Sequence, residues 1–156
     1  MRMQWTWIDR AQYDSGPWDT EPDKVMWWDE ATGLPCVAQR NAHFGNWCGY
    51  VGVPHHHTWY EVPKERLPDL HVHGGLTFSD HVDWDSTLWW LGFDCCHGFD
   101  LTPYHWPMPE GMVDPLRQYG TYRTLAYVEA ECARLAEQLD LAQQVQDSGI
   151  ADRTTT

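Results

Sequence analysis

Residues 122–145, YRTLAYVEAECARLAEQLDLAQQV, decide the fold class of this chain because they carry one long amphipathic pattern. The stretch contains neither Pro nor Gly, the two residues that most often interrupt a helix. Its apolar side chains recur at the helical spacing of three and four residues, at Leu125, Val128, Cys132, Leu135, Leu139 and Ala142. We predict one helix with Thr121 as its N-cap and Asp147-Ser148-Gly149 as its end.

Five short apolar runs earlier in the chain have the length and composition of β-strands. They are residues 25–28, 34–40, 48–53, 70–78 and 87–95. The turn sequence DEATG at 29–33 indicates a hairpin, and TLWWLGFDC at 87–95 is the most strand-like run, which we expect beside 70–78. Residues 1–24 read as irregular, with strand character only at 4–8. The prediction is an α+β fold, an antiparallel sheet of about four to five strands with the long C-terminal helix packed on one face.

The length of 156 residues suits one domain. We assign residues 1–150 to a single α+β domain and residues 151–156 to a disordered tail. Prolines at both ends of residues 54–68 indicate a long exposed loop in which His55-His56-His57 would be solvated. Four prolines between residues 100 and 119 exclude a continuous helix there, so we expect a connecting arm.

The formal net charge is -13, from 23 Asp and Glu against 10 Lys and Arg. Such a surface repels phosphate backbones and anionic membranes, which argues against general nucleic-acid binding and membrane association. The acidic charge is compatible with a small molecule, a metal ion or a basic groove on another protein as the partner. The charge does not indicate an oligomeric state. No apolar run approaches the roughly 20 residues that span a bilayer, and we expect a cytoplasmic protein.

The five cysteines are odd in number and form no Cys-x-x-Cys pair. Neither a disulfide framework nor a thiolate zinc site is therefore indicated. We expect reduced thiols that are mostly buried.

The densest polar constellation lies at the ends of two predicted strands. On a strand, His71 and His73 would face the same side, and Asp94, His97 and Asp100 follow the strongest strand at intervals of three. Two imidazoles with one or two carboxylates suit zinc, manganese or iron with one position open for water. Such a metal would lower the pKa of that water and permit hydrolysis. The alternative is that these groups only hydrogen-bond the turns after two strands.

Further candidates would surround a ligand at this constellation. The chain has eleven tryptophans, and Trp89 and Trp90 lie close enough in sequence to form aromatic walls. Arg40 and Arg123 are candidates for contact with an anionic group. Glu131, beside the apolar stripe of the helix, is a candidate for acid–base work.

Several blocks in fixed order carry a resemblance to a known family. They are CGYVGVP at 48–54, VHGGLTF at 72–78, WWLGFDC at 89–95 with His97 and Asp100, and the helix to Leu139. Over roughly residues 36 to 140 the chain resembles an uncharacterised family of small proteins encoded by bacteriophages and prophages. That family has Asp where this chain has His71, whereas His73, Asp94, His97 and Asp100 match. The resemblance therefore favours the last four as the ligand set and leaves His71 out.

A phage context implies a protein of the host cytoplasm that counters host defence. The leading hypothesis is an accessory protein that binds a small polar ligand, such as a nucleotide-derived signal that it would sequester. The pocket would have tryptophan walls and lie near His73, Asp94, His97 and Asp100. The first alternative is a metal-dependent hydrolase with zinc or a similar divalent ion on the His and Asp side chains. The second is an acidic protein that blocks a host effector by occupying its basic groove.

Overall fold

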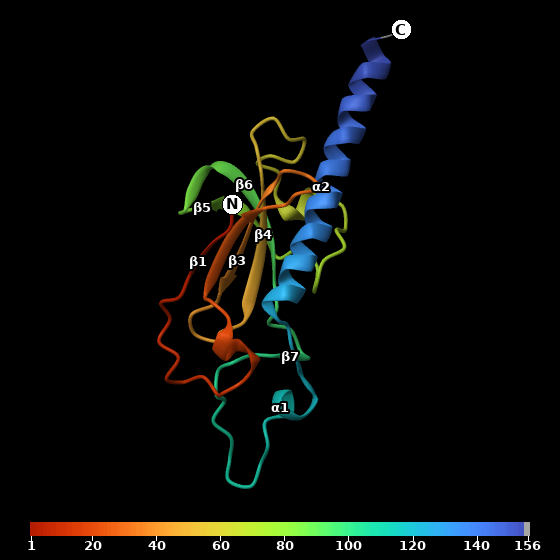
Figure 1. Cartoon of the computed structure of the whole chain (residues 1–156). Helices are drawn as coiled ribbons and strands as arrows, with labels where there is room; N and C mark the ends of the chain where they lie inside the picture. The colour runs from red at the N-terminus through yellow and green to blue at the C-terminus, as the bar shows by residue number, and fades with distance from the viewer. Residues whose placement is uncertain (155–156) are drawn as a thin grey trace.

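The computed structural model describes residues 1–154 and contains a six-stranded antiparallel sheet with one long helix against it (Figure 1). The strand order is β1-β2-β3-β4-β6-β5. The strands are β1 (Met3–Trp5), β2 (Lys24–Trp28), β3 (Pro35–Arg40), β4 (Trp47–Val53), β5 (Phe78–Val82) and β6 (Asp85–Asp94). The α+β prediction is confirmed, with one strand more than predicted. Edge strand β1 overlaps the start of residues 4–8, which is the one segment with strand character in the otherwise irregular stretch that we expected at 1–24.

The helix α2 (Leu125–Thr154) lies across one face of the sheet and packs on β3 and β4 (Figure 1). Because side chains alternate along a strand, every second residue of the central strands points at the helix. The interface is fully buried and includes Val25, Ala38, Val51, Leu91, Val128, Cys132, Leu135 and Leu139. The predicted helical stripe is thus the surface that covers the sheet.

Both ends of α2 differ from the prediction. Thr124, not Thr121, is the N-cap, because the N–H of Tyr127 donates to Thr124 Oγ1 at 3.1 Å. Residues Thr121–Tyr122 instead form β8, a short strand parallel to β7 (Asp100–Leu101). The helix continues through Gly149 to Thr154, since one internal Gly costs a helix only about 1 kcal/mol. Residues 151–154 of the predicted tail are therefore helical, and Thr155 and Thr156 lie outside the described residues.

Residues 70–78 are not the strand that we expected. The N–H of Gly75 donates to the carbonyl of Val72 at 2.9 Å and closes a turn. Gly74 and Gly75 have φ of 69° and 80°, in the left-handed region that glycine adopts without steric cost. The strand starts only at Phe78, and β5 pairs with β6 from there. Apolar and polar residues alternate in this run as in a strand, but most of the run forms a turn.

The loop over residues 54–68 is anchored where we expected exposure. His57 is buried, and its Nε2 lies 2.8 Å from the carbonyl oxygen of Leu139 in α2. Its Nδ1 accepts from the N–H of Trp59 at 3.0 Å. His55 and His56 are exposed, as predicted, so the three histidines have two different environments.

The arm over residues 100–119 contains β7 and the short helix α1 (Pro115–Tyr119), and it returns to β8 just before α2. The remaining elements are two 3-10 turns, Pro17–Thr20 and Lys64–Arg66. This path brings Asp100 beside Arg123, two residues before α2, although the two are 23 residues apart in sequence.

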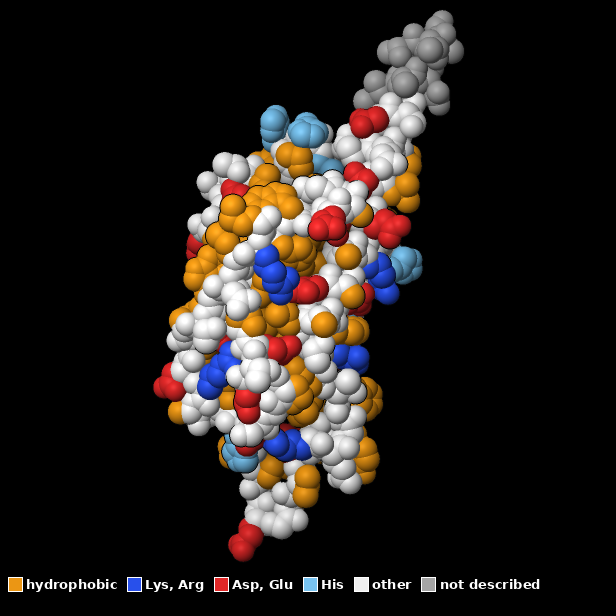
Figure 2. Space-filling model, in the orientation of Figure 1, with side chains coloured by type: hydrophobic (Ala, Val, Ile, Leu, Met, Phe, Trp, Pro, Cys, Tyr) orange, Lys and Arg blue, Asp and Glu red, His pale blue; other side chains and the backbone are white. Residues whose placement is uncertain are grey.

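Figure 2 shows acidic side chains scattered over the visible face among basic ones rather than gathered in one patch. None of the described helices combines the length and apolar character that crossing a membrane requires. All five cysteines are free thiols, and Cys36, Cys95 and Cys132 are buried.

Candidate functional site

Three side chains from separate segments meet at one end of the sheet. His73 lies in the turn before β5, His97 in the turn after β6, and Asp100 begins β7. One potential metal-ligand atom from each lies within 4.8 Å of the others. His73 Nε2 is 2.7 Å from Asp100 Oδ2, and His97 Nδ1 is 3.4 Å from the same oxygen. We call these three residues the His–Asp cluster.

Local turn chemistry positions His97 against Asp100. The N–H of Asp100 donates to the carbonyl of His97 at 2.9 Å, and the N–H of His97 donates back to Asp100 Oδ2 at 3.0 Å. The side chain of Asp100 therefore stabilises the turn that carries its neighbour.

Gly74 is required at the place where the other turn approaches this one. The imidazole of His97 packs directly on Gly74, and a Cβ at residue 74 would overlap the ring. The positive φ of Gly74 disfavours any other residue as well. The glycine next to His73 is thus part of the architecture of the cluster.

Two side chains hold the cluster from behind, Tyr127 in the first turn of α2 and Arg123 just before the helix. Tyr127 Oη lies 2.8 Å from His73 Nδ1, and Arg123 Nε donates to Asp100 Oδ1 at 3.0 Å. His73 is consequently held at both ring nitrogens, one toward Tyr127 and one toward Asp100. Such outer contacts fix the orientation of an imidazole and the nitrogen that it presents.

The electrostatics keep Asp100 ionised. Burial acts to raise the pKa of Asp100, but hydrogen bonds from His73, from the N–H of His97 and from Arg123 outweigh it and lower the pKa below its usual value. Burial, reinforced by the charge of Glu131, raises the pKa of Tyr127, so its phenol stays protonated.

The three side chains of the cluster differ in their exposure to solvent. The side chain of Asp100 is 2% exposed and that of His73 12%, whereas that of His97 is 40% exposed. An approaching molecule therefore meets His97 first.

Asp94 borders the cluster without entering it. Its Oδ1 is 3.8 Å from His97 Nδ1, but the same carboxylate accepts from Thr77 Oγ1 at 3.0 Å and from the N–H of Cys96 at 3.1 Å. Three members of the predicted metal set thus come together, and Asp94 lies at their edge.

Of the predicted ligand-contacting residues, only Arg123 reaches the cluster. Arg40 is buried elsewhere, 3.1 Å from Glu21 and 3.7 Å from Asp23. Trp89 packs in the core between sheet and helix, and Trp90 is buried on the opposite face of the sheet against Trp84. The two side chains face opposite sides of the sheet because side chains alternate along a strand. Neither tryptophan forms a wall of the cluster, contrary to the prediction.

His71 also lies apart. Its side chain is exposed, and its carbonyl accepts from Arg134 Nε at 2.6 Å. The expectation that His71 and His73 face one side fails because the residues are in a turn, not a strand. Sequence reasoning overlooked Tyr127, for which the only signal was its helical spacing of four from Arg123.

Glu131 is buried one helical turn beyond Tyr127. Its Oε1 lies 3.5 Å from the Tyr127 hydroxyl and its Oε2 3.4 Å from Arg134 Nε. It therefore touches the cluster only through Tyr127.

Searches with protein-family models, among curated proteins and among solved structures find no match to this chain. The chemistry of the site must be argued from its own residues. Two imidazoles and one ionised carboxylate, half enclosed and supported from outside, have the composition of a three-ligand metal centre.

Proposed function

We propose that the His–Asp cluster binds a divalent transition metal, with zinc the best match, and that the protein is a metal-dependent hydrolase. The observation that carries this is the convergence of one ligand atom each from His73, His97 and Asp100 within 4.8 Å. Zinc favours imidazole and carboxylate ligands and takes three of them in catalytic sites.

Each residue has a distinct task in this proposal. His73 Nε2 and Asp100 Oδ2 already point at one another at 2.7 Å, so a metal would be held between these atoms and replace their hydrogen bond. Tyr127 would keep His73 oriented through Nδ1, and Arg123 would hold the second oxygen of Asp100. His97 would supply the third ligand from the solvent side.

A metal with three protein ligands retains a position for water and lowers the pKa of that water to about 7. A substrate would approach the metal from the side of His97, whose side chain is 40% exposed. Glu131 contacts Tyr127 and none of the three proposed ligands, so it would support the site only indirectly.

The first experiment is a zinc titration of metal-free protein by calorimetry, with native mass spectrometry to count bound ions. We expect one ion per chain, and loss of binding in the single variants His73→Ala and His97→Ala. The matched control is His71→Ala, which removes an exposed imidazole two residues from His73 and should bind like wild type. Absence of stoichiometric zinc would refute the metal centre.

Hydrolysis is tested separately with chromogenic phosphate, phosphodiester and carboxylate esters, with and without zinc. Turnover that needs zinc and disappears in His97→Ala supports the hydrolase. Stoichiometric zinc without turnover of any ester class would leave a metal-binding protein and argue against the catalytic part of the proposal.

A further inference from the structure

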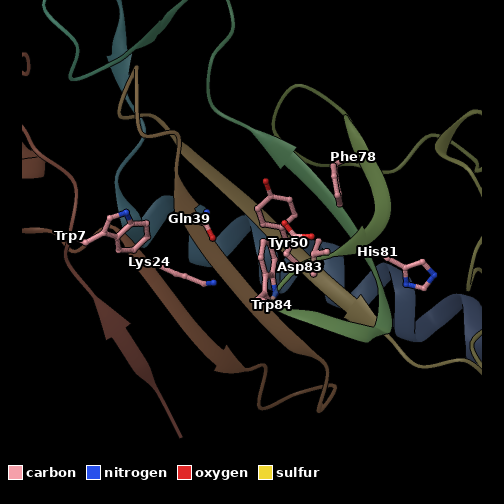
Figure 3. A pocket seen from close by; sticks show the side chains of 9 residues that line it. Trp7, Lys24, Gln39, Tyr50, Phe78, His81, Asp83 and Trp84 are labelled. Carbon is pink, nitrogen blue, oxygen red and sulfur yellow. The ribbon is translucent and has the colours of Figure 1, made fainter.

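The face of the sheet opposite α2 carries a groove that the His–Asp cluster does not use. Its volume is about 610 Å³, within the range of small-molecule sites. Figure 3 shows its side chains on the near side of the strands, with the helix behind the sheet. The residues that matter here are Trp7, Lys24, Gln39, Tyr50, Phe78 and Trp84.

Aromatic rings form the walls and floor of this groove. Trp84, from the turn between β5 and β6, folds back over the sheet so that its ring centroid is 5.5 Å from that of Tyr50. Phe78 meets Tyr50 edge to face at 5.4 Å. Gly92 allows this arrangement, because a Cβ at residue 92 would overlap the Tyr50 ring. Trp7 stands at the rim, 55% exposed.

Lys24 is a cation without an anionic partner. Its Nζ lies 4.4 Å from the centroid of Trp84, and within the described part of the chain it forms no ion pair with a carboxylate. Burial alone lowers the pKa of Lys24. A desolvated ammonium in an otherwise acidic protein is a binding feature for an anion, since an ion pair would recover part of the lost hydration.

Two polar atoms in the same groove lack hydrogen bonds. Neither the side-chain oxygen of Gln39 nor Nε1 of Trp84 has a partner among the described residues, although both atoms are buried. Such atoms cost stability unless something else satisfies them. A ligand with a polar ring edge would supply a donor to Gln39 and an acceptor to Trp84.

We infer that this groove binds a planar heteroaromatic anion of mononucleotide size. The rings of Trp84 and Trp7 would stack on the flat part of the ligand, as aromatic side chains stack on bases. Gln39 and Trp84 would bond its polar edge, and Lys24 its phosphate or carboxylate. Asp83 also lines the groove and disfavours a second anionic group nearby, so one phosphate or carboxylate is preferred over a polyphosphate.

The test is a titration of the full chain with four probes, adenosine monophosphate, adenosine, indole-3-acetate and inorganic phosphate. Binding is followed by calorimetry and by the indole N–H resonance of Trp84, assigned from its loss in Trp84→Phe. We expect the two aromatic anions to bind and shift this resonance, adenosine to bind at least about tenfold more weakly, and phosphate alone not to bind.

The variant Lys24→Gln should bind adenosine monophosphate no better than wild type binds adenosine. The control is Lys64→Gln, which alters an exposed lysine outside the groove that pairs with Glu65 and should change nothing. Circular dichroism verifies that both variants fold. If neither aromatic anion moves the Trp84 resonance at millimolar concentration, or if Lys24→Gln binds like wild type, the inference is wrong. Because the His–Asp cluster is untouched, zinc binding should persist in Lys24→Gln whatever this outcome.

Discussion

Glu21 Oε2 accepts a hydrogen bond of 2.6 Å from the N–H of Leu125, the first residue of α2. Its other oxygen, Oε1, accepts from Tyr122 and from Arg40 Nη2, the latter at 3.1 Å. One carboxylate thus caps the long helix and neutralises the buried guanidinium of Arg40. Glu21 lies more than a hundred residues before Leu125 in the chain. Negative charge at a helix N-terminus is stabilising, and a buried charge left unpaired is costly.

The variant Glu21→Gln should therefore lower the free energy of unfolding by about 3 kcal/mol, because the longer contact to Asp23 is then, among residues 1–154, the one ion pair left to the buried Arg40 guanidinium. Urea unfolding followed by fluorescence measures this. Glu65→Gln, which loses only the exposed contact to Lys64, should show no measurable change. Equal stability of Glu21→Gln and wild type would contradict the role of Glu21.

Gly74→Ala should disrupt the His–Asp cluster. The new methyl group would displace the imidazole of His97, and the left-handed backbone would add about 1–2 kcal/mol of strain. The neighbouring Gly75→Ala is the matched control, because Gly75 has a similar φ but nothing near its missing Cβ. Both variants should lose stability to a similar degree, and only Gly74→Ala should lose zinc affinity. Equal zinc affinity in the two variants would show that His97 does not need this turn.

His57 should make the anchoring of its loop depend on pH. Burial lowers the pKa of His57, and the hydrogen bonds to Leu139 and Trp59 use one ring nitrogen as donor and the other as acceptor. The neutral form is thus favoured in the fold. The contribution of neutral His57 to the free energy of unfolding is complete above about pH 6.5, the pKa of histidine in the unfolded chain. This contribution is lost as the pH falls from there through the lower pKa of His57 in the folded protein.

Urea unfolding between pH 7.5 and 5 measures this effect. The stability of wild type should fall more steeply with decreasing pH than that of His57→Gln, and exposed His55→Gln should follow wild type. Parallel curves for wild type and His57→Gln would contradict the prediction.

Cys96 should be the one thiol that reacts in the native protein, because it is the exposed cysteine. Its reaction should be slow, since partial burial and the charges of Asp94 and Asp100 raise its pKa. Burial raises the pKa of Cys36 and Cys48 to about 12, which suppresses their thiolates. Ellman's reagent should count about one thiol in native wild type, none in native Cys96→Ser, and five in denatured wild type. Rapid labelling of native Cys96→Ser would show that the buried thiols are accessible.

The elements that the sequence predicts well are those with a long or strict period. The stripe from Leu125 to Leu139 and the strands β2, β3, β4 and β6 follow from local spacing, because burial on one face imposes that spacing directly. The errors fall where the same residues suit two structures. Residues 70–78 alternate like a strand but turn at two glycines, and Gly149 resembles a helix stop but lies inside α2.

For the site, the sequence by itself determined the residue types and the short interval from His97 to Asp100, which one turn brings together. Only the tertiary structure decided that His73 joins them and that Tyr127 and Arg123 stand behind them. It also decided that Arg40 and the two tryptophans do not. Local periodicity reports which face of an element is buried, whereas the meeting of distant segments depends on strand register, on positive-φ turns and on where a helix starts. Those features are set by packing across the whole chain.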